Sequence, residues 1–436
     1  MYLHLFRFVL PLVITELVYE FGLQVLNGGI VRMPQATATL AAYGLAWGIT
    51  SLLASTVSQT RQMSMVLVKN RAAYKTTLQC VIGFGGIHAL LLASLAFTPV
   101  GTWVVDDLHG VDQALGDVVR EALSYLLPIP LIVGVTRFYS GLLLRVRRTD
   151  VISYAMTAAI SMSILSVFLL LSSDVIQSKP ILLPLFATYA AALTECSVIF
   201  FGYRRFARQT LSEADESNAS SERPPLTRSY ALRFYWPLAA TIGIQGASRP
   251  IINLFVARGM DGIESLAILT IVYALAHLPY GWLNELKNLP AAFQHQDPTA
   301  HTIRRFSAMC GLLSFTTMIV MFWTPVRTYL LETLIGVGHD FAVLCHTPLV
   351  IFSFFPLAVM IRAHLHGLAL RDHRTGAMAP SGPARIIAII TMLNVLPLFD
   401  IHGAARGVAA LLSGFVIETS VVWWGITRRK YAKYDH

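Results

Sequence analysis

Apolar residues form long runs along the chain, and short segments rich in charge, glycine and proline separate them. Many of these runs reach about twenty residues, the length at which an α-helix crosses the hydrocarbon core of a bilayer. The pattern predicts twelve spanning helices, at about residues 5–31, 37–67, 76–98, 115–144, 151–172, 181–203, 230–257, 265–291, 305–325, 342–370, 383–399 and 403–427.

The composition supports a membrane protein. Hydrophobic residues make up 55% of the chain and charged residues 13%, whereas a soluble domain carries about 25% charged residues. The mean hydropathy is +0.61. The net charge of +9 comes from short basic clusters between apolar runs, which is typical of membrane orientation rather than of nucleic-acid binding. The four cysteines are widely scattered, so they indicate neither a disulfide framework nor a metal site.

The polar stretch near the midpoint divides the chain. We predict a six-helix bundle at 1–206, a cytoplasmic linker at 207–229 and a second six-helix bundle at 230–436. The halves match at an offset of 226 positions; for example Arg7, Pro11, Thr15 and Asn27 correspond to Arg233, Pro237, Thr241 and Asn253. An even number of crossings makes the two repeats parallel, as in transporters whose halves move about a central cavity.

Lys and Arg set the predicted orientation. They gather in the loops on one side, for example at Arg145, Arg147 and Arg148, whereas the opposite loops carry most of the acids. Positively charged loops stay on the cytoplasmic side, so both termini are expected there, in a plasma membrane or bacterial cytoplasmic membrane.

Polar residues recur at helical spacing inside the predicted spans. Ionisable groups there cost roughly 2.5–3.5 kcal/mol each, so each needs a cavity, a partner or a function. We take as candidate substrate ligands Gln245, Arg249, Asn253, Asn27, His277, Tyr280, Arg362 and His366. Glu20, Glu195 and Glu418 are the candidate proton carriers for coupled transport.

Each candidate also has a structural interpretation. Arg249 and Arg362 can bond carbonyl groups or a glutamate and so fix helices together. Asn27 and Asn253 can join helices by hydrogen bonds. Glu195 and Glu418 lie near the predicted cytoplasmic ends and can be structural.

The polar stripes together favour a cavity that receives a small anion. The planar guanidinium donors of Arg249 and Arg362 suit a carboxylate or a phosphate. The sequence has no phosphate-binding loop, nucleophile elbow or zinc motif, so we expect no enzyme, no cofactor and no bound metal.

Several motifs resemble the progressive ankylosis protein (ANKH-like) family. They are Ser248-Arg249-Pro250-Ile251-Ile252-Asn253, His277-Leu278-Pro279-Tyr280-Gly281-Trp282, Arg362-Ala363-His364-Leu365 and Ser413-Gly414-Phe415-Val416-Ile417-Glu418. The first half resembles the family at fewer positions, namely Leu26-Asn27, Leu40-Ala41-Ala42-Tyr43-Gly44 and His109-Gly110-Val111-Asp112.

The resemblance implies a fold similar to the multidrug and polysaccharide-lipid exporter superfamily, all-α, with about twelve helices in two bundles around a central cavity. It also implies export of small anions, namely inorganic pyrophosphate, citrate or ATP. Arg249, Asn253, Arg362, His364 and Glu418 match the family pattern.

The chain departs from the family in three respects. Animal members have a basic residue where this chain has Glu195, an Asp where it has Glu20, and a long acidic tail that it lacks. The first difference bears on anion preference and coupling, and the last on regulation through the tail.

Three functions therefore remain open. The first is an exporter of small polyanions, with the anion and the lipid bilayer as its partners and no role for nucleic acid. The second is a membrane regulator of anion release that carries nothing itself. The third is a cation-coupled drug or lipid exporter of the same fold. The oligomeric state is not indicated.

Overall fold

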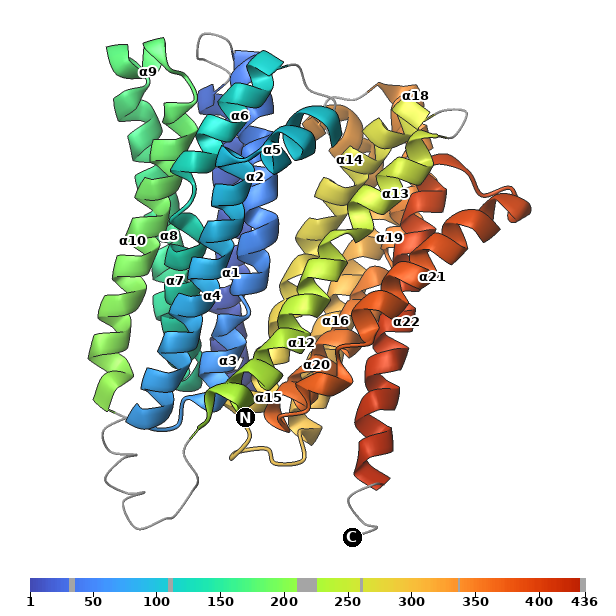
Figure 1. The fold of residues 1–436 in the computed structure, drawn as a ribbon. Coiled ribbons are helices and arrows are strands. Elements are labelled where there is room, and N and C mark those ends of the chain that lie inside the picture. The colour runs from blue at the N-terminus through green and yellow to red at the C-terminus, as the bar shows by residue number, and fades with distance from the viewer. Residues whose placement is uncertain (31–35, 109–112, 210–225, 259–261, 336–337, 432–436) are drawn as a thin grey trace. The chain divides into compact units, whose positions relative to one another are not determined.

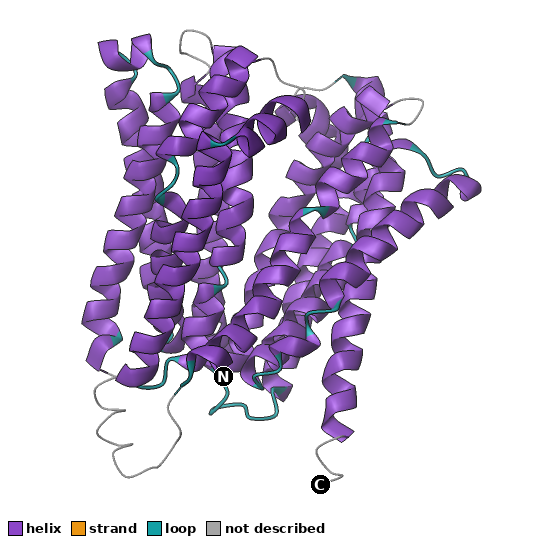
Figure 2. Cartoon of the chain, in the orientation of Figure 1, coloured by secondary structure: helices purple, strands orange, loops and turns teal. Residues whose placement is uncertain are grey.

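The computed structural model describes residues 1–30, 36–108, 113–209, 226–258, 262–335 and 338–431 (Figure 1). These described residues are almost entirely helical and contain no strand (Figure 2). The chain folds as two compact units. One comprises residues 7–239, and the other comprises residues 240–436 together with 1–6.

The helices of the first half are α1 (Tyr2–Ile30), α2 (Ala36–Val57), α3 (Thr60–Leu67), α4 (Arg71–Phe97), α5 (Pro99–Thr102), the π-helical turn η1 (Trp103–Leu108), α6 (Gln113–Tyr125), α7 (Ile129–Arg145), α8 (Thr149–Leu170), α9 (Asp174–Ser178) and α10 (Leu182–Phe206).

The second half has more breaks. Its helices are α12 (Arg228–Gly246), α13 (Ser248–Ala257), α14 (Gly262–Tyr280), the 3-10 helix η2 (Gly281–Asn288), α15 (Leu289–Ala292), α16 (His301–Trp323), α17 (Val326–Thr328), the π-helical turn η3 (Tyr329–Ile335), α18 (His339–Leu344), α19 (His346–Phe352), α20 (Phe355–Arg371), η4 (Thr375–Ala377), α21 (Ser381–Val395), η5 (Leu396–Phe399) and α22 (Gly403–Tyr431).

The predicted all-α polytopic fold is confirmed. Within the described residues, eight helical segments are long and apolar enough to cross a membrane, and the pair α6 and α7, bent by 42°, makes a ninth. Helices α1 and α2 and the pair α12 and α13 supply the remaining segments of the expected six per half. The protein is therefore an integral membrane protein.

Two predicted helices are broken at proline. The span predicted at 230–257 is interrupted at Ala247, because Pro250 has no backbone N–H to bond the carbonyl of Gly246. The span predicted at 265–291 passes from α-helix to 3-10 helix directly after Pro279 and Tyr280. Both breaks lie next to candidate site residues.

Apolar side chains cover much of the outer surface of the spanning helices. Leu90 and Phe97 of α4 are 72% and 70% exposed, and Leu169 of α8 is 69% exposed. Such exposure would be costly in water, whereas in lipid it is the expected state.

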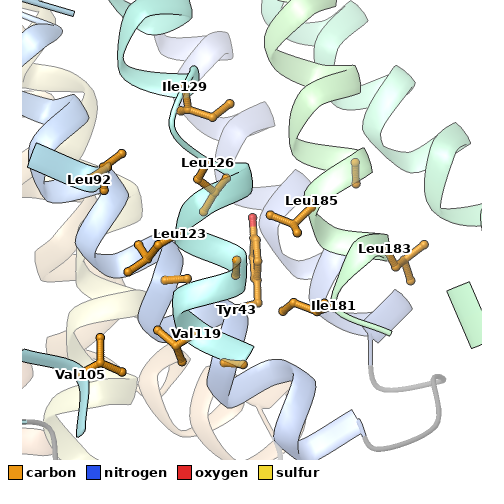
Figure 3. Close-up of a cluster of buried hydrophobic side chains, with 14 of the residues drawn as sticks. Tyr43, Leu92, Val105, Val119, Leu123, Leu126, Ile129, Ile181, Leu183 and Leu185 are labelled. Atoms are coloured by element: carbon orange, nitrogen blue, oxygen red, sulfur yellow. The ribbon is translucent and has the colours of Figure 1, made fainter. Parts of the chain in front are cut away.

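A buried apolar cluster holds the first unit together. Leu123 of α6 and Leu126 pack with Leu92 of α4 and Leu185 of α10, and Tyr43 of α2 lies among them (Figure 3). The Tyr43 hydroxyl shares a hydrogen bond of 2.8 Å with the hydroxyl of Thr188, so its polar end is satisfied.

The backbone repeats at the offset found in the sequence. Helices α7 and α20 begin and end 226 positions apart, and the π-helical turns η1 and η3 begin at the same separation. Arg147 and His373, also 226 apart, follow these helices with positive φ of 61° and 56°. The duplicated halves thus share even their irregular turns.

One close helix crossing is duplicated as well. A Cβ at Gly141 of α7 would lie 2.2 Å from the carbonyl oxygen of Arg61, and a Cβ at Gly367 of α20 would lie 2.7 Å from that of Lys287. Glycine therefore lets α7 and α20 approach the backbone of the segment that follows the second helix of each half.

Candidate functional site: a buried carboxylate shared by two arginines

Glu418 of α22 is the centre of a buried polar cluster in the second unit. Its side chain is 0% exposed. Arg362 of α20 lies 3.2 Å from Glu418 Oε2 through Nη1, and Arg385 of α21 lies 3.0 Å from the same oxygen through its own Nη1. Three consecutive helices thus bring two guanidinium groups to one carboxylate.

Two amide side chains add hydrogen bonds to this cluster. Gln245 of α12 donates through Nε2 to Glu418 Oε1 at 2.5 Å. Arg362 donates through Nη2 to Asn284 Oδ1 of η2 at 2.5 Å. A buried charge is tolerated only when its partners replace water, and these amides supply that replacement.

His366 lies one turn beyond Arg362 on α20. Its Nε2 atom is 3.7 Å from Glu418 Oε1, beyond hydrogen-bond distance, and its side chain is 11% exposed. This nitrogen is buried and has no hydrogen-bond partner among the described residues. His364, on the other side of the same helix, is also buried, at 8% exposed.

Phe415, one turn before Glu418 on α22, lies close to both guanidinium groups. Arg362 Cζ is 4.5 Å from the centroid of its ring and Arg385 Cζ is 4.2 Å from it. Both cations therefore lie against an aromatic face as well as against the carboxylate. With two cations and one anion, the paired groups carry one surplus positive charge in a poorly solvated place, where its attraction for an anion is strong.

Arg249 lies on α13, beyond the break at Ala247, and is exposed. Its Cζ atom is 4.8 Å from the ring centroid of Tyr273 on α14. The hydroxyl of Tyr273 is buried and has no hydrogen-bond partner among the described residues.

A row of aromatic rings connects Arg249 with the Glu418 cluster. Tyr273 packs on Phe352, Phe352 on Phe355 at 4.4 Å, and Phe355 on Phe415 at 5.3 Å between centroids. Tyr280 lies beside this row, 5.6 Å from Phe355. The ring of His277 meets that of Tyr280 edge-on at 5.4 Å.

The structure therefore brings some predicted site residues together and separates others. Gln245, Arg362, His366 and Glu418 form one cluster, and Arg249, His277 and Tyr280 lie along the aromatic row. Asn253 is exposed on α13 and belongs to neither group. The side chains of Glu20 and Asn27, both on α1, lie outside the described part of the chain.

Glu195 lies in the first unit. It pairs at 3.2 Å with Arg137 of α7, and the two side chains are 15% and 24% exposed. Glu195 corresponds to Glu418 at an offset of 223, whereas Arg137 lies one position after Thr136, the residue that corresponds to Arg362 in the 226-position register. The first half holds one arginine against its glutamate, whereas the second half holds two.

The sequence alone did not single out Arg385 or Arg137, and Asn284 belonged to a polar stripe without being taken as a candidate ligand. Arg385 lies near the start of the helix predicted at 383–399, where a charged side chain can reach the membrane–water interface. The helix begins two residues earlier, at Ser381, and a Cβ added at Gly414 would lie 3.1 Å from Cγ of Arg385. Arg137 gave a clear signal, because it is a single cation within an apolar run.

Comparison with known proteins finds a matching family and several solved structures of the same fold. The sequence model of the progressive ankylosis protein (ANKH) family matches residues 1–324. Among solved structures, the MATE transporter VcmN of Vibrio cholerae in its bent form is 15% identical, with a TM-score of 0.73 over 98% of this chain and 96% of that one.

Two further transporters share the fold. The eukaryotic MATE transporter AtDTX14 is 12% identical, with a TM-score of 0.72 over 97% of this chain and 95% of that one. A MOP superfamily transporter from Pyrococcus furiosus is 14% identical, with a TM-score of 0.65 over 99% of this chain and 96% of that one. The reversed polarity of its binding pocket suggests a different function for that protein.

Proposed function

Because the chain belongs to the progressive ankylosis protein family, we propose that it exports small polyanions by alternating access of its two halves. Inorganic pyrophosphate, citrate and ATP are the substrates to test, as the family resemblance implies. The lipid bilayer and the anion are its partners in this proposal.

The observation that carries this proposal is the arrangement of Arg362 and Arg385 around Glu418. Both guanidinium groups reach the same carboxylate oxygen, at 3.2 and 3.0 Å. A guanidinium presents planar paired donors that fit a carboxylate or a phosphate equally well. Glu418 therefore occupies the position that the carboxylate or phosphate of a substrate would take.

In the proposed cycle, the substrate displaces Glu418 from one or both arginines. Since Glu418 is 0% exposed, the anion reaches the guanidinium groups only when the surrounding helices move apart. Glu418 then either keeps its charge or takes up a proton, which is how it would couple transport to a proton gradient. Arg249, exposed on α13, is the candidate for first contact with the anion.

Flux through purified protein in liposomes tests this site. Arg362→Ala and Arg385→Ala should each lower citrate, pyrophosphate or ATP flux about tenfold or more, because a hydrogen bond to a charged group contributes roughly 1.5–3 kcal/mol. Arg305→Ala is the matched control, since Arg305 is an exposed arginine of α16 outside the cluster, and it should leave flux unchanged. Wild-type flux in both Arg362→Ala and Arg385→Ala would reject the site.

The same liposomes separate the proposal from its two alternatives. If the wild-type protein moves none of the three anions, a regulator that carries nothing itself is favoured. If it moves cationic amphiphiles and does not respond to anions, a drug or lipid exporter of the same fold is favoured.

A further inference from the structure

A basic cavity of about 410 Å³ lies at one end of the first unit, far along the chain from the Glu418 cluster. Its walls come from the start of α4 and the end of α10 (Figure 1). The lining residues are Arg71, Tyr74, Lys75, Phe200, Tyr203, Arg204 and Arg208. A volume of this size is within the range of small-molecule sites.

Four of the lining residues are cations, and the described lining includes no acid. Arg71 and Lys75 come from α4, and Arg204 and Arg208 come from the end of α10 and the residues after it. Cations gathered in one concave place repel one another and raise the local concentration of anions. A bound anion with several negative oxygens would relieve that repulsion.

The floor of the cavity is aromatic and well packed. The rings of Tyr74 and Tyr203 stack with 5.9 Å between centroids and 8° between planes. The Tyr74 hydroxyl shares a hydrogen bond of 3.1 Å with that of Tyr139, whose ring lies 4.8 Å from Tyr203. This packing fixes the floor, so the cations surround a shaped cavity rather than a flat surface.

The cavity lies at the level where the spanning helices meet the aqueous phase. Arg71 begins one apolar span and Phe206 ends another, and the lining residues come from these two ends. Phospholipid phosphates lie at this depth of a bilayer, next to the hydrocarbon core. A ligand here can place phosphate oxygens on the cations and an apolar part against the rings.

We propose that this cavity binds the phosphate group of a larger organic molecule. The phosphate belongs either to the headgroup of an anionic phospholipid or to a soluble organic phosphate. The proposal concerns the first unit alone and does not depend on the anion transport assigned to the second.

Membrane topology does not by itself account for the basic residues of this cavity. Basic residues on the cytoplasmic side set the topology wherever they stand near a span. Arg205, next to Arg204, illustrates that role, because it lies against the ring of Phe206 and does not line the cavity. The cavity and its stacked floor are additional to the topology signal.

Thermal unfolding of the full-length protein in detergent micelles tests the proposal, since a ligand that binds the folded state raises Tm. The probes are a short-chain phosphatidylinositol phosphate, its water-soluble inositol phosphate headgroup, and a short-chain phosphatidylcholine as the lipid control. The variants are Lys75→Gln, Lys75→Gln with Arg204→Gln, and the matched control Arg205→Gln. Lys75 is exposed, so its substitution leaves the fold intact.

We expect the phosphorylated lipid to raise Tm in the wild type and in Arg205→Gln. Its affinity should fall about tenfold in Lys75→Gln and about a hundredfold in the double variant, because each lost charged donor contributes about 1.5 kcal/mol or more. Stabilisation by the lipid alone identifies a membrane source, and equal stabilisation by the soluble headgroup identifies a soluble one. The proposal is overturned if no phosphorylated probe raises Tm, or if Lys75→Gln responds as the wild type does.

Discussion

At the scale of single residues, Glu418 is the group whose charge matters most. Its charge compensates one of the two guanidinium charges that lie beside it and near the ring of Phe415. Buried ion pairs add little net stability when complete, but removal of one partner leaves an uncompensated charge. The carboxylate therefore stabilises the fold, and under the proposed function it also competes with the substrate anion.

Glu418→Gln should lower the stability of the empty protein by about 3–5 kcal/mol, because two arginines then lose the anion that they share. Citrate or pyrophosphate should raise Tm more in this variant than in the wild type, since the anion can take the vacated place. Glu264→Gln, at an exposed acid of α14, is the control and should respond to anions as the wild type does. Equal anion responses in Glu418→Gln and the wild type would contradict competition between Glu418 and substrate.

At the scale of elements, Asp297 anchors the start of α16. Its Oδ2 accepts a hydrogen bond of 2.9 Å from the backbone N–H of Ile303, and its Oδ1 accepts one of 3.2 Å from that of His301. Burial raises the pKa of this carboxyl, but the N–H groups of Ile303, Thr302 and His301 favour the charged form more and bring the pKa below its ordinary value. Negative charge at a helix N-terminus is favourable for the same reason.

Asp297→Asn should therefore cost about 1 kcal/mol at pH 7. A carboxyl whose pKa is lower in the folded state stabilises the fold above its unfolded pKa of about 3.9, and this contribution is lost as the pH falls through the folded pKa. The difference in Tm between wild type and variant should shrink as the pH is taken from 7 to 3. A constant difference in Tm from pH 7 to pH 3 would show that the charge of Asp297 does not stabilise the fold.

The close approach of α20 to the segment after α14 gives a second test at this scale. Gly367→Ala places a Cβ 2.7 Å from the carbonyl oxygen of Lys287, so backbone must move, at a cost of about 1–3 kcal/mol. Gly83→Ala on α4 is the control, because a Cβ there meets nothing within 4 Å, and alanine is the better helix former. Thermal unfolding should show a lower Tm for Gly367→Ala only. A Tm unchanged from wild type would mean that α20 shifts without cost.

At the scale of the whole molecule, the duplication was the most informative feature of the sequence. Paired Pro, Gly and Arg residues in one register predicted two parallel six-helix repeats, and the backbone repeats in the same register down to the turns at Arg147 and His373. Such residues constrain the backbone directly, so a single sequence reveals them.

The candidate site was predictable only in part. Arg362, His366 and Glu418 stand out because each is polar within an apolar run, where burial needs a reason. The convergence of α20, α21 and α22 on one carboxylate depends on long-range helix packing, which no periodicity in one sequence encodes. Arg385 was missed for that reason, and Arg249, beyond the break at Ala247, lies against Tyr273.

The unequal number of arginines in the two halves has an electrical consequence under the proposed function. The Arg362, Arg385 and Glu418 group carries one surplus positive charge when empty, and a polyanion of charge two or more reverses its sign while Glu418 keeps its charge. Loaded and empty forms then respond in opposite directions to the membrane potential, with about 2.3 kcal/mol per charge for each 100 mV. An interior-negative voltage would drive the loaded site outward and draw the empty one back. The resting potential of the cell would thus help to power export without any ATPase.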